Sequence, residues 1–310
     1  MRVIEAINGG LHRLMEKDPA MIILGEDIVD PYGGAFRATK GLSTAHPGRV
    51  WSMPISEAGM VGVATGLAVA GKPAIVELMF GDFITLAADA LINHAAKFSW
   101  MYNDQVEVPI IVRTPMGGRR GYGPTHSQCL EKLFCGVPGL TVCAANEFSD
   151  PAALYERAHR ARSPHLIIED KVMYARPLRD PDALPDPGDA DITLVSYGSA
   201  LSLCAEAARR LKDEEELETR VVPIEQLYPF PAAELRHALG RCSRVIVVEE
   251  AAGGWGFGAE CAAALIGRVK HFRTLSGPDH PLPSSREWEE AVLPSVADIV
   301  STAIDLFEAE

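Results

Sequence analysis

The chain has 310 residues, 47% of them hydrophobic and 23% charged, with a formal net charge of −13 at pH 7. This length allows one large or two ordinary domains, and the negative charge excludes a surface built for nucleic acid or an anionic membrane. Because no run approaches 18 apolar residues and the first residues lack a signal-peptide pattern, we expect a cytoplasmic protein without membrane contact.

Helical and strand-like segments alternate through the first half of the chain. Apolar residues recur at helical spacing from Val3 to Met15 and predict the first helix. Continuous apolar runs are typical of strands that parallel sheets bury on both faces. The pattern then predicts a strand over 21–27, a glycine-rich loop over 30–42, a helix after Glu57, a strand over 74–80, a helix over 86–101, a strand over 108–114, a strand over 140–145, a helix over 151–162 and a strand over 165–170.

The alternation of helical and strand-like segments stops near residue 176 and resumes near residue 192. Several prolines among acidic residues in 176–191 exclude a regular element there, so we expect a linker. Beyond it the pattern predicts strands over 192–198, 220–224 and 244–250 and helices over 201–211, 231–239, 257–269 and 295–308. This alternation predicts two α/β domains with doubly wound, largely parallel sheets. We place them at 1–178 and 192–310, with the linker at 179–191.

The six cysteines show neither a C-x-x-C pair nor a spacing typical of metal sites, and most stand inside apolar runs. We therefore expect reduced core thiols and no metal held by this chain. They are Cys129, Cys135, Cys143, Cys204, Cys242 and Cys261.

One carboxylate stands before an unusually small and apolar segment, "SMPISEAGMVGVATGLAVAG" at 52–71. A helix start explains Glu57, because a negative charge is favourable at a helix N-terminus. It does not explain Gly59, Gly62 and Gly66, which lower helix propensity and allow another backbone or a flat ligand to approach closely. From these residues, a plain helix start and a carboxyl kept in a dry pocket for proton exchange both stay open.

A glycine-rich loop, "TPMGGRRGYGPTHSQ" at 114–128, follows a predicted strand end, the edge where open α/β sheets bind ligands. It ends in residues that can form hydrogen bonds, and His126 suits acid–base work or substrate anchoring because it titrates near neutral pH. Arg119 and Arg120 have two interpretations, carboxylate binding or simple solvation.

A second glycine turn, Gly254-x-Gly256-x-x-Ala259, lies between a predicted strand and a helix. A dinucleotide site of this kind requires an acidic residue at the end of the next strand, and the run "HFRTLSG" has none. We therefore expect a structural turn. Signatures of other nucleotide, hydrolase and metalloprotease sites, and a G-D-G followed by asparagine, are missing from the sequence.

Seven segments in a fixed order resemble one family, the β subunits of thiamine-diphosphate-dependent 2-oxo acid dehydrogenases of the pyruvate, branched-chain and acetoin type. The resemblance covers nearly the whole chain. The segments are "GEDI" at 25–28, "PISEAGMVGVATGLAVAG" at 54–71, "FGDF" at 80–83, "THSQ" at 125–128, "CGVPGLTV" at 135–142, "VEE…GGWGFGAE" at 248–260 and "GPDHPLPSSREWEEAVLPS" at 277–295.

The resemblance implies a pyrimidine-binding transketolase-like domain followed by a transketolase C-terminal-like domain. It also implies an α₂β₂ heterotetramer with thiamine diphosphate at the α–β interface and Mg²⁺ held mainly by the α subunit, which fits the missing G-D-G-x-N motif. The implied reaction is oxidative decarboxylation of a small 2-oxo acid, with acyl transfer to a lipoyl-bearing dihydrolipoyl acyltransferase core. Such an enzyme is active only with its α subunit.

The resemblance also implies roles for single residues. Glu57 matches the family glutamate that binds N1′ of the aminopyrimidine and shuttles its proton, which low-polarity surroundings favour. Ile55 occupies the adjoining contact position, Phe83 packs against the pyrimidine, and the glycine-rich helix gives the ring room. His126 matches the histidine that orients the 2-oxo acid or the acyl acceptor, and Glu26 stands where the family has an acid near the cofactor.

The chain departs from the family at three places. Met79 replaces a glutamine found in some members, which reduces polar contact with the cofactor ring. Ala161 and Ser163 replace the Asp and Asn expected at a structural potassium site. The segment "IEQLYPFP" at 224–231 is closer to the 2-oxoglutarate type, so the substrate stays open.

Three alternatives remain beside the dehydrogenase subunit. An acetoin dehydrogenase or transketolase-like carboligase subunit would share the cofactor chemistry with another acceptor. A non-catalytic scaffold would only dock the α chain, and a nicotinamide enzyme would bind NAD.

Overall fold

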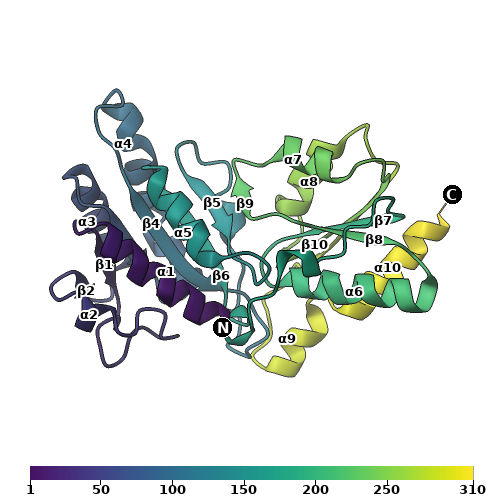
Figure 1. Ribbon diagram of the computed structural model, residues 1–310, viewed down its shortest axis with the longest axis horizontal. Coiled ribbons are helices and arrows are strands. Elements are labelled where there is room, and N and C mark those ends of the chain that lie inside the picture. Colours follow the sequence, from purple (N-terminus) through teal and green to yellow (C-terminus); the bar gives the residue numbers. More distant parts are fainter. Residues whose placement is uncertain (310) are drawn as a thin grey trace.

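Two open sheets organise the chain in the computed structural model, which describes residues 1–309 (Figure 1). The first sheet has the order β2-β1-β3-β4-β6-β5-β9, and every pair is parallel except β5–β9. Parallel pairing matches the fully buried strands, since both faces carry helices. The bounds are β1 Ile22–Gly25, β2 Val50–Ser52, β3 Ala74–Glu77, β4 Ile110–Met116, β5 Thr141–Ala144, β6 His165–Asp170 and β9 Gln226–Tyr228.

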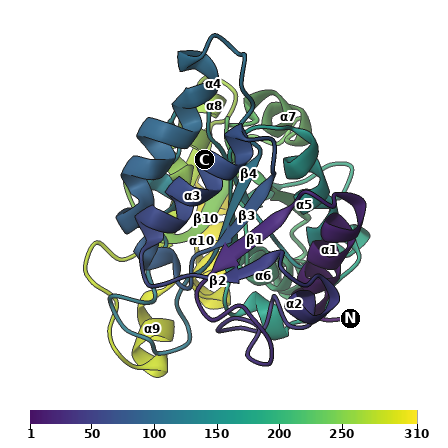
Figure 2. The ribbon, with the colours of Figure 1, turned by 90° about the vertical axis from the view of Figure 1, so that its left-hand side faces the viewer.

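Helices cover both faces of this sheet. Figure 2 shows α1 (Val3–Lys17) and α5 (Pro151–Arg160) on one side of strands β1, β3 and β4, and α3 (Glu57–Val69) and α4 (Ala96–Met101) on the other. Each helix turns an apolar face toward the strands and forms a core there. The remaining short elements are α2 Leu42–Ala45, the 3₁₀ helices η1 Gly81–Ala87, η3 Glu131–Leu133, η4 Met173–Ala175 and η5 Pro181–Ala183, and the π helix η2 Ala90–Ala95.

The second sheet has four parallel strands in the order β11-β10-β7-β8. Helices α6 and α10 pack together on one face, and α7 and α8 cover the other (Figure 1). The bounds are β7 Ile192–Ser196, β8 Thr219–Pro223, β10 Arg244–Ala252, β11 His271–Gly277, α6 Ala200–Glu215, α7 Ala232–Ala238, α8 Phe257–Leu265, α9 Arg286–Val292 and α10 Val296–Glu308.

The two doubly wound parallel sheets confirm the predicted fold class. The single helix expected over 86–101 is wrong, because this stretch is divided among η1, η2 and α4. The loop expected from residue 114 begins after Met116, since β4 is longer than predicted. The short elements β2, β9 and α9 were missed. The boundaries 1–178, 179–191 and 192–310 stay a prediction, with one qualification: β9 comes from the second part of the chain and completes the first sheet.

The two sheets share apolar packing where they meet. One buried cluster continues from the α3 side of the first sheet into the second, where the rings of Tyr197 and Phe257 lie 4.9 Å apart. Glu131 is buried at this junction and accepts a hydrogen bond from the Tyr197 hydroxyl. Burial raises the pKa of Glu131 to about 7, because the charged form is poorly solvated there.

We expect the Glu131 carboxyl to make the chain less stable as the pH rises from about 4.5 to about 7. The folded state keeps this proton in that window while the unfolded state releases it, so the free energy of unfolding falls. In Glu131→Gln the free energy of unfolding should fall less over this pH window, by up to about 3 kcal/mol, which is the free-energy equivalent of the pKa change. Urea unfolding at pH 5 and pH 8 measures it, with exposed Glu234→Gln as the control. An unchanged pH dependence in Glu131→Gln would contradict the assignment.

Candidate functional site

The predicted site residues follow the carboxyl ends of four neighbouring parallel strands. Glu26 follows β1, residues 53–56 lead from β2 to Glu57, Met79 follows β3, and the loop with His126 follows β4. The carboxyl ends of parallel strands lie on one edge, where open α/β sheets bind ligands. The fold therefore brings these segments to a single edge of the first sheet.

Glu57 is the first residue of α3 and only 6% of its surface is exposed. Within residues 1–309 its carboxylate forms no hydrogen bond, and the Oε1 atom of buried Glu26 also lacks a partner there. The pKa of Glu26 is raised because burial disfavours its charge, and the nearby Glu57 and Asp27 carboxylates add to this. Two buried acids thus form a pair that is ready to receive a hydrogen-bond donor.

The glycines of α3 lie away from this pair. Met60, Val61 and Ala64 are buried on the side of Glu57, whereas Gly59, Gly62 and Gly66 belong to the exposed face of the helix. A Cβ atom built at Gly62 or Gly66 would meet no described atom within 4 Å. The glycines leave open space on the outside of α3, so the expected room for a ring beside Glu57 does not come from them.

Aromatic rings surround His126. Its imidazole lies 4.9 Å from the Phe80 ring and 5.2 Å from the Phe83 ring, both edge-on, and its Nδ1 lies 2.9 Å from the Thr125 hydroxyl. The Nζ atom of Lys171 donates to the His126 carbonyl oxygen at 2.6 Å. Phe83 and His126, far apart in sequence, are therefore in direct contact, and half-buried His126 can present a polar edge to a ligand.

The other predicted residues are less closely involved. Met79 is half-buried at the end of β3, and Ile55 is 84% exposed. Because α3 packs against η1, the helix that carries Glu57 adjoins the segment that carries Phe83. An open cavity of about 600 Å³ lies beside the His126 loop, lined among others by Thr125, Gln128 and residues of the second sheet's loops.

The sequence patterns did not single out two polar residues at this edge. Asp82 accepts hydrogen bonds from the Gln128 backbone N–H and, at 2.8 Å, from its side-chain Nε2. Lys171 is buried, and burial lowers its pKa. The available signals were the "FGDF" segment for Asp82 and, for Lys171, its position directly after β6 at the same edge.

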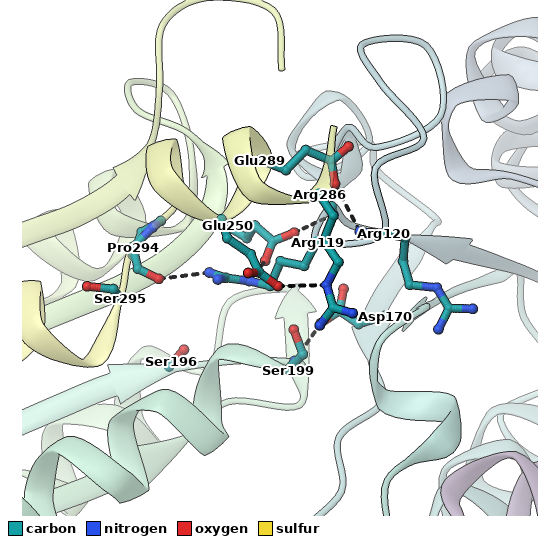
Figure 3. Close-up of polar contacts among 12 residues, drawn as sticks. Arg119, Arg120, Asp170, Ser196, Ser199, Glu250, Arg286, Glu289, Pro294 and Ser295 are labelled. Carbon is teal, nitrogen blue, oxygen red and sulfur yellow. Dashed lines mark hydrogen bonds and ion pairs between the residues drawn. The ribbon is translucent and has the colours of Figure 1, made fainter. Parts of the chain in front are cut away.

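The two loop arginines have different environments (Figure 3). The Nε atom of Arg119 donates to Oε2 of Glu250 at 2.9 Å, and its Nη2 donates to the Pro294 carbonyl at 2.8 Å. The side chain of Arg120 is exposed. Arg119 therefore binds a carboxylate of this chain and ties the loop to the second sheet.

The glycine turn at 254–259 is already occupied by a side chain of the protein. The carboxylate of Glu249, on β10, accepts from the backbone N–H groups of Phe257 and Gly258, at the start of α8, at 3.1 and 3.2 Å. A dinucleotide would need these amides for its diphosphate. The prediction of a structural turn therefore has a physical basis.

Residues 1–309 offer neither a cluster of metal-binding side chains nor a membrane-spanning helix. They contain no group of three or more His, Cys, Asp or Glu side chains that could hold a metal ion. None of the helices in the same residues is both long and apolar enough to cross a membrane.

Comparison with known proteins identifies the family of both parts of the chain. Residues 1–177 match the family model described as "Transketolase, pyrimidine binding domain", and residues 182–299 match "Transketolase, C-terminal domain". The chain is 32% identical to the mitochondrial pyruvate dehydrogenase E1 component subunit beta-1 of Arabidopsis thaliana, over 97% of this chain and 87% of that protein. It is 33% identical to the acetoin:2,6-dichlorophenolindophenol oxidoreductase subunit beta of Cupriavidus necator, over 96% and 95%.

Solved structures share the fold. A split-gene transketolase described as an inactive β4 tetramer has a TM-score of 0.79 at 21% identity, covering 99% of this chain and 98% of that one. A mutant transketolase of Pichia stipitis has a TM-score of 0.73 at 17% identity, covering 99% of this chain and 46% of that one.

Proposed function

The chain belongs to the transketolase-like family of thiamine-diphosphate-dependent 2-oxo acid dehydrogenase β subunits, and from this premise we propose that it is the β subunit of such a heteromeric enzyme. The enzyme would decarboxylate a 2-oxo acid oxidatively and transfer the acyl group to a lipoyl-bearing acyltransferase core. The observation that carries the proposal is the buried Glu57 carboxylate, which has no hydrogen-bond partner in residues 1–309 and lies in the part matched by the pyrimidine-binding model.

The residues at the sheet edge fit the pyrimidine part of thiamine diphosphate. The unpartnered Glu57 carboxylate and Glu26 Oε1 atom can accept hydrogen bonds from a ring nitrogen and its substituents. Phe83 offers an aromatic face nearby, with half-buried Met79 and exposed Ile55 as further apolar contacts. Ile55 would meet the cofactor where the partner chain closes the site.

The bound cofactor supplies a nucleophilic carbon for attack on the substrate carbonyl. Glu57 would hold and return the proton at N1′ of the aminopyrimidine. Glu26 supports this role, because burial and the neighbouring Glu57 carboxylate raise the pKa of Glu26 and so favour its protonated form beside Glu57. His126 would orient the 2-oxo acid or the acyl acceptor, and its place between the rings of Phe80 and Phe83 would hold the imidazole for this role.

We propose an α subunit as partner in an α₂β₂ heterotetramer, with Mg²⁺ held mainly by that subunit. The support is the open face of α3, where the exposed glycines are flanked by the exposed apolar side chains of Val63 and Val69. Apolar surface of this kind marks sites of protein association. Activity would depend on the α subunit, because the family resemblance assigns the Mg²⁺ and diphosphate site to that subunit.

The proposed assembly acts in the cytoplasm without membrane or nucleic acid. All six cysteines are free thiols, which fits a reducing compartment, and the net charge of −13 disfavours anionic partners. The Arabidopsis relative is a mitochondrial protein by name, and the relative from Cupriavidus necator is not so described.

A second candidate is a subunit of an acetoin dehydrogenase or a related carboligase. It is favoured by the 33% identity to the acetoin oxidoreductase β subunit, which this chain matches over 95% of its length. The two functions share the acid pair and differ in the substrate or in the acceptor.

Reconstitution with an α chain that carries G-D-G-x-N tests the proposal. We expect turnover of a 2-oxo acid that requires both chains, thiamine diphosphate with Mg²⁺, and a lipoyl domain as acceptor. Acetoin turnover would favour the second candidate, and free carboligation would indicate the transketolase-like alternative. Absence of thiamine diphosphate binding by the two-chain complex would contradict all three.

A further inference from the structure

The loop that carries His126 is held by the C-terminal part of the chain. Residues 117–128 follow β4 and contact Glu250 of β10 and Glu289 of α9, each more than 130 residues away in sequence from the loop residues that it binds (Figure 3). The loop contains no regular element, and Arg119, Gly121 and Gly123 all have positive φ angles. Its conformation therefore depends on contacts with other segments.

Glu289, in α9, accepts four hydrogen bonds from this loop. Its Oε2 atom accepts from the backbone N–H groups of Arg120 at 2.9 Å and Gly121 at 2.8 Å. Its Oε1 atom accepts from the Gly123 N–H at 3.1 Å and from the Ser127 hydroxyl at 2.5 Å. The side chain is fully buried. One carboxylate thus replaces the backbone partners that the loop lacks, and hydrogen bonds to a charged acceptor are the stronger kind.

The loop fits closely against α9. A Cβ atom at Gly121 would lie 2.9 Å from the backbone nitrogen of Arg286, and one at Gly123 would lie 2.9 Å from the Ser284 hydroxyl. Because both glycines also have positive φ angles, other residues would be strained there. The close approach therefore leaves no room for a side chain at either glycine.

His126 is fixed from two sides by this arrangement. The hydroxyl of Ser127, the next residue, donates a hydrogen bond to Glu289. The carbonyl oxygen of His126 accepts one from Lys171, the residue directly after β6. The imidazole is then confined between Phe80 and Phe83. A second contact, from Glu250 to the Gly118 N–H and the Arg119 side chain, holds the start of the loop and not the His126 end.

We propose that Glu289 is a positioning residue that sets the orientation of His126, so that the C-terminal domain contributes to the reaction through this loop. The inference rests on the proposed function, since it assigns Glu289 an effect on a step in which His126 takes part. Glu289 acts through hydrogen bonds to the loop and makes no contact with substrate.

Glu289→Gln tests the proposal in the two-chain complex. The amide keeps the size of the side chain but replaces one carboxylate oxygen by an NH₂ group. This group cannot accept the hydrogen bonds that the loop donates. We expect kcat to fall about 10- to 100-fold, as for a displaced catalytic group, with thiamine diphosphate affinity within about 2-fold of wild type. Glu290→Gln, exposed and adjacent on α9, is the matched control and should leave kcat unchanged.

A double-mutant cycle separates positioning from general stability. In a His126→Ala background, Glu289→Gln should cause little further loss, because the group it positions is gone. The proposal would be overturned if Glu289→Gln lowered kcat by the same factor in both backgrounds. It would also be overturned if the losses of kcat paralleled a lower urea midpoint of unfolding. If Glu289→Gln does not fold, Ser127→Ala removes one of the four donors and should show the same dependence on His126 more weakly.

Amide hydrogen exchange provides a readout that does not need activity. Glu289→Gln should accelerate exchange of residues 120–128 while the strands of both sheets keep their protection. Unchanged exchange in the loop would overturn the proposal. If the wild-type complex turns over no 2-oxo acid, the proposed function fails, and this exchange result alone still decides whether Glu289 holds the loop.

Discussion

Glu57→Gln is expected to abolish decarboxylation of the 2-oxo acid by the two-chain complex, with a loss of about 100- to 10,000-fold in kcat, the range for removal of a general acid–base group. The carboxylate is buried at the start of α3, where the helix N-terminus favours a negative charge, and no side chain of residues 1–309 forms a hydrogen bond with it. Glutamine preserves the shape but cannot exchange a proton. Initial rates with a lipoyl domain as acceptor measure the effect.

The comparison needs a control that separates catalysis from assembly. Glu16→Gln changes an exposed glutamate of α1 and should leave the rate unchanged. Gel filtration should show that Glu57→Gln still assembles with the α chain, because a buried neutral side chain is no harder to accommodate than a buried charge. If the variant keeps most of its activity, Glu57 does not handle the proton, and the scaffold alternative gains support.

Much of the fold could be predicted because its signals are local. Strands β4 and β6 each contain a short apolar run, IIV and LII, and α1 repeats apolar residues at helical spacing, so local patterns indicate these elements directly. β2 and β9 have three residues each, too few for a period to appear. They form because each hydrogen-bonds to the free edge of a neighbouring strand. The break of the segment 86–101 into different helical types is likewise set by packing rather than by propensity.

Part of the candidate site could likewise be predicted from local signals, and part of it could not. Glu26, Glu57 and His126 lie in segments that follow parallel strands, so the topology brings these segments to one edge of the sheet. The role of Glu289 could not be predicted, because it depends on the approach of two segments more than 160 residues apart. The same holds for Arg119, whose partner Glu250 lies on the other sheet.

The second large effect is expected at Arg113, which lies fully buried beneath the site. Its guanidinium binds the carboxylates of Glu77 and Glu169, and it donates to the hydroxyls of Tyr155 and Tyr174. We expect Arg113→Met to lower the free energy of unfolding by about 3–5 kcal/mol, because it leaves two buried carboxylates without a cation. Urea denaturation of the isolated chain measures this change.

The environment of Glu77 explains why this arginine also matters for the site. Burial raises the pKa of Glu77 and the Arg113 charge opposes that rise, so loss of the guanidinium favours the protonated acid at the end of β3. Met79 and Phe80 follow directly, and Phe36 links this layer to the site, with its ring 5.4 Å from Tyr174 and 5.8 Å from Phe80. We therefore expect the site to lose order together with the network.

Two further variants decide whether buried charge is the cause. Adding Glu77→Gln and Glu169→Gln to Arg113→Met removes both carboxylates and should restore part of the lost stability, since neutral amides can hydrogen-bond to the tyrosines. Arg157→Met breaks the partly exposed pair with Glu225 and should cost no more than about 1 kcal/mol. Similar losses for Arg113→Met and Arg157→Met, or no recovery in the triple variant, would show that packing around Arg113, and not its charge, holds this layer together.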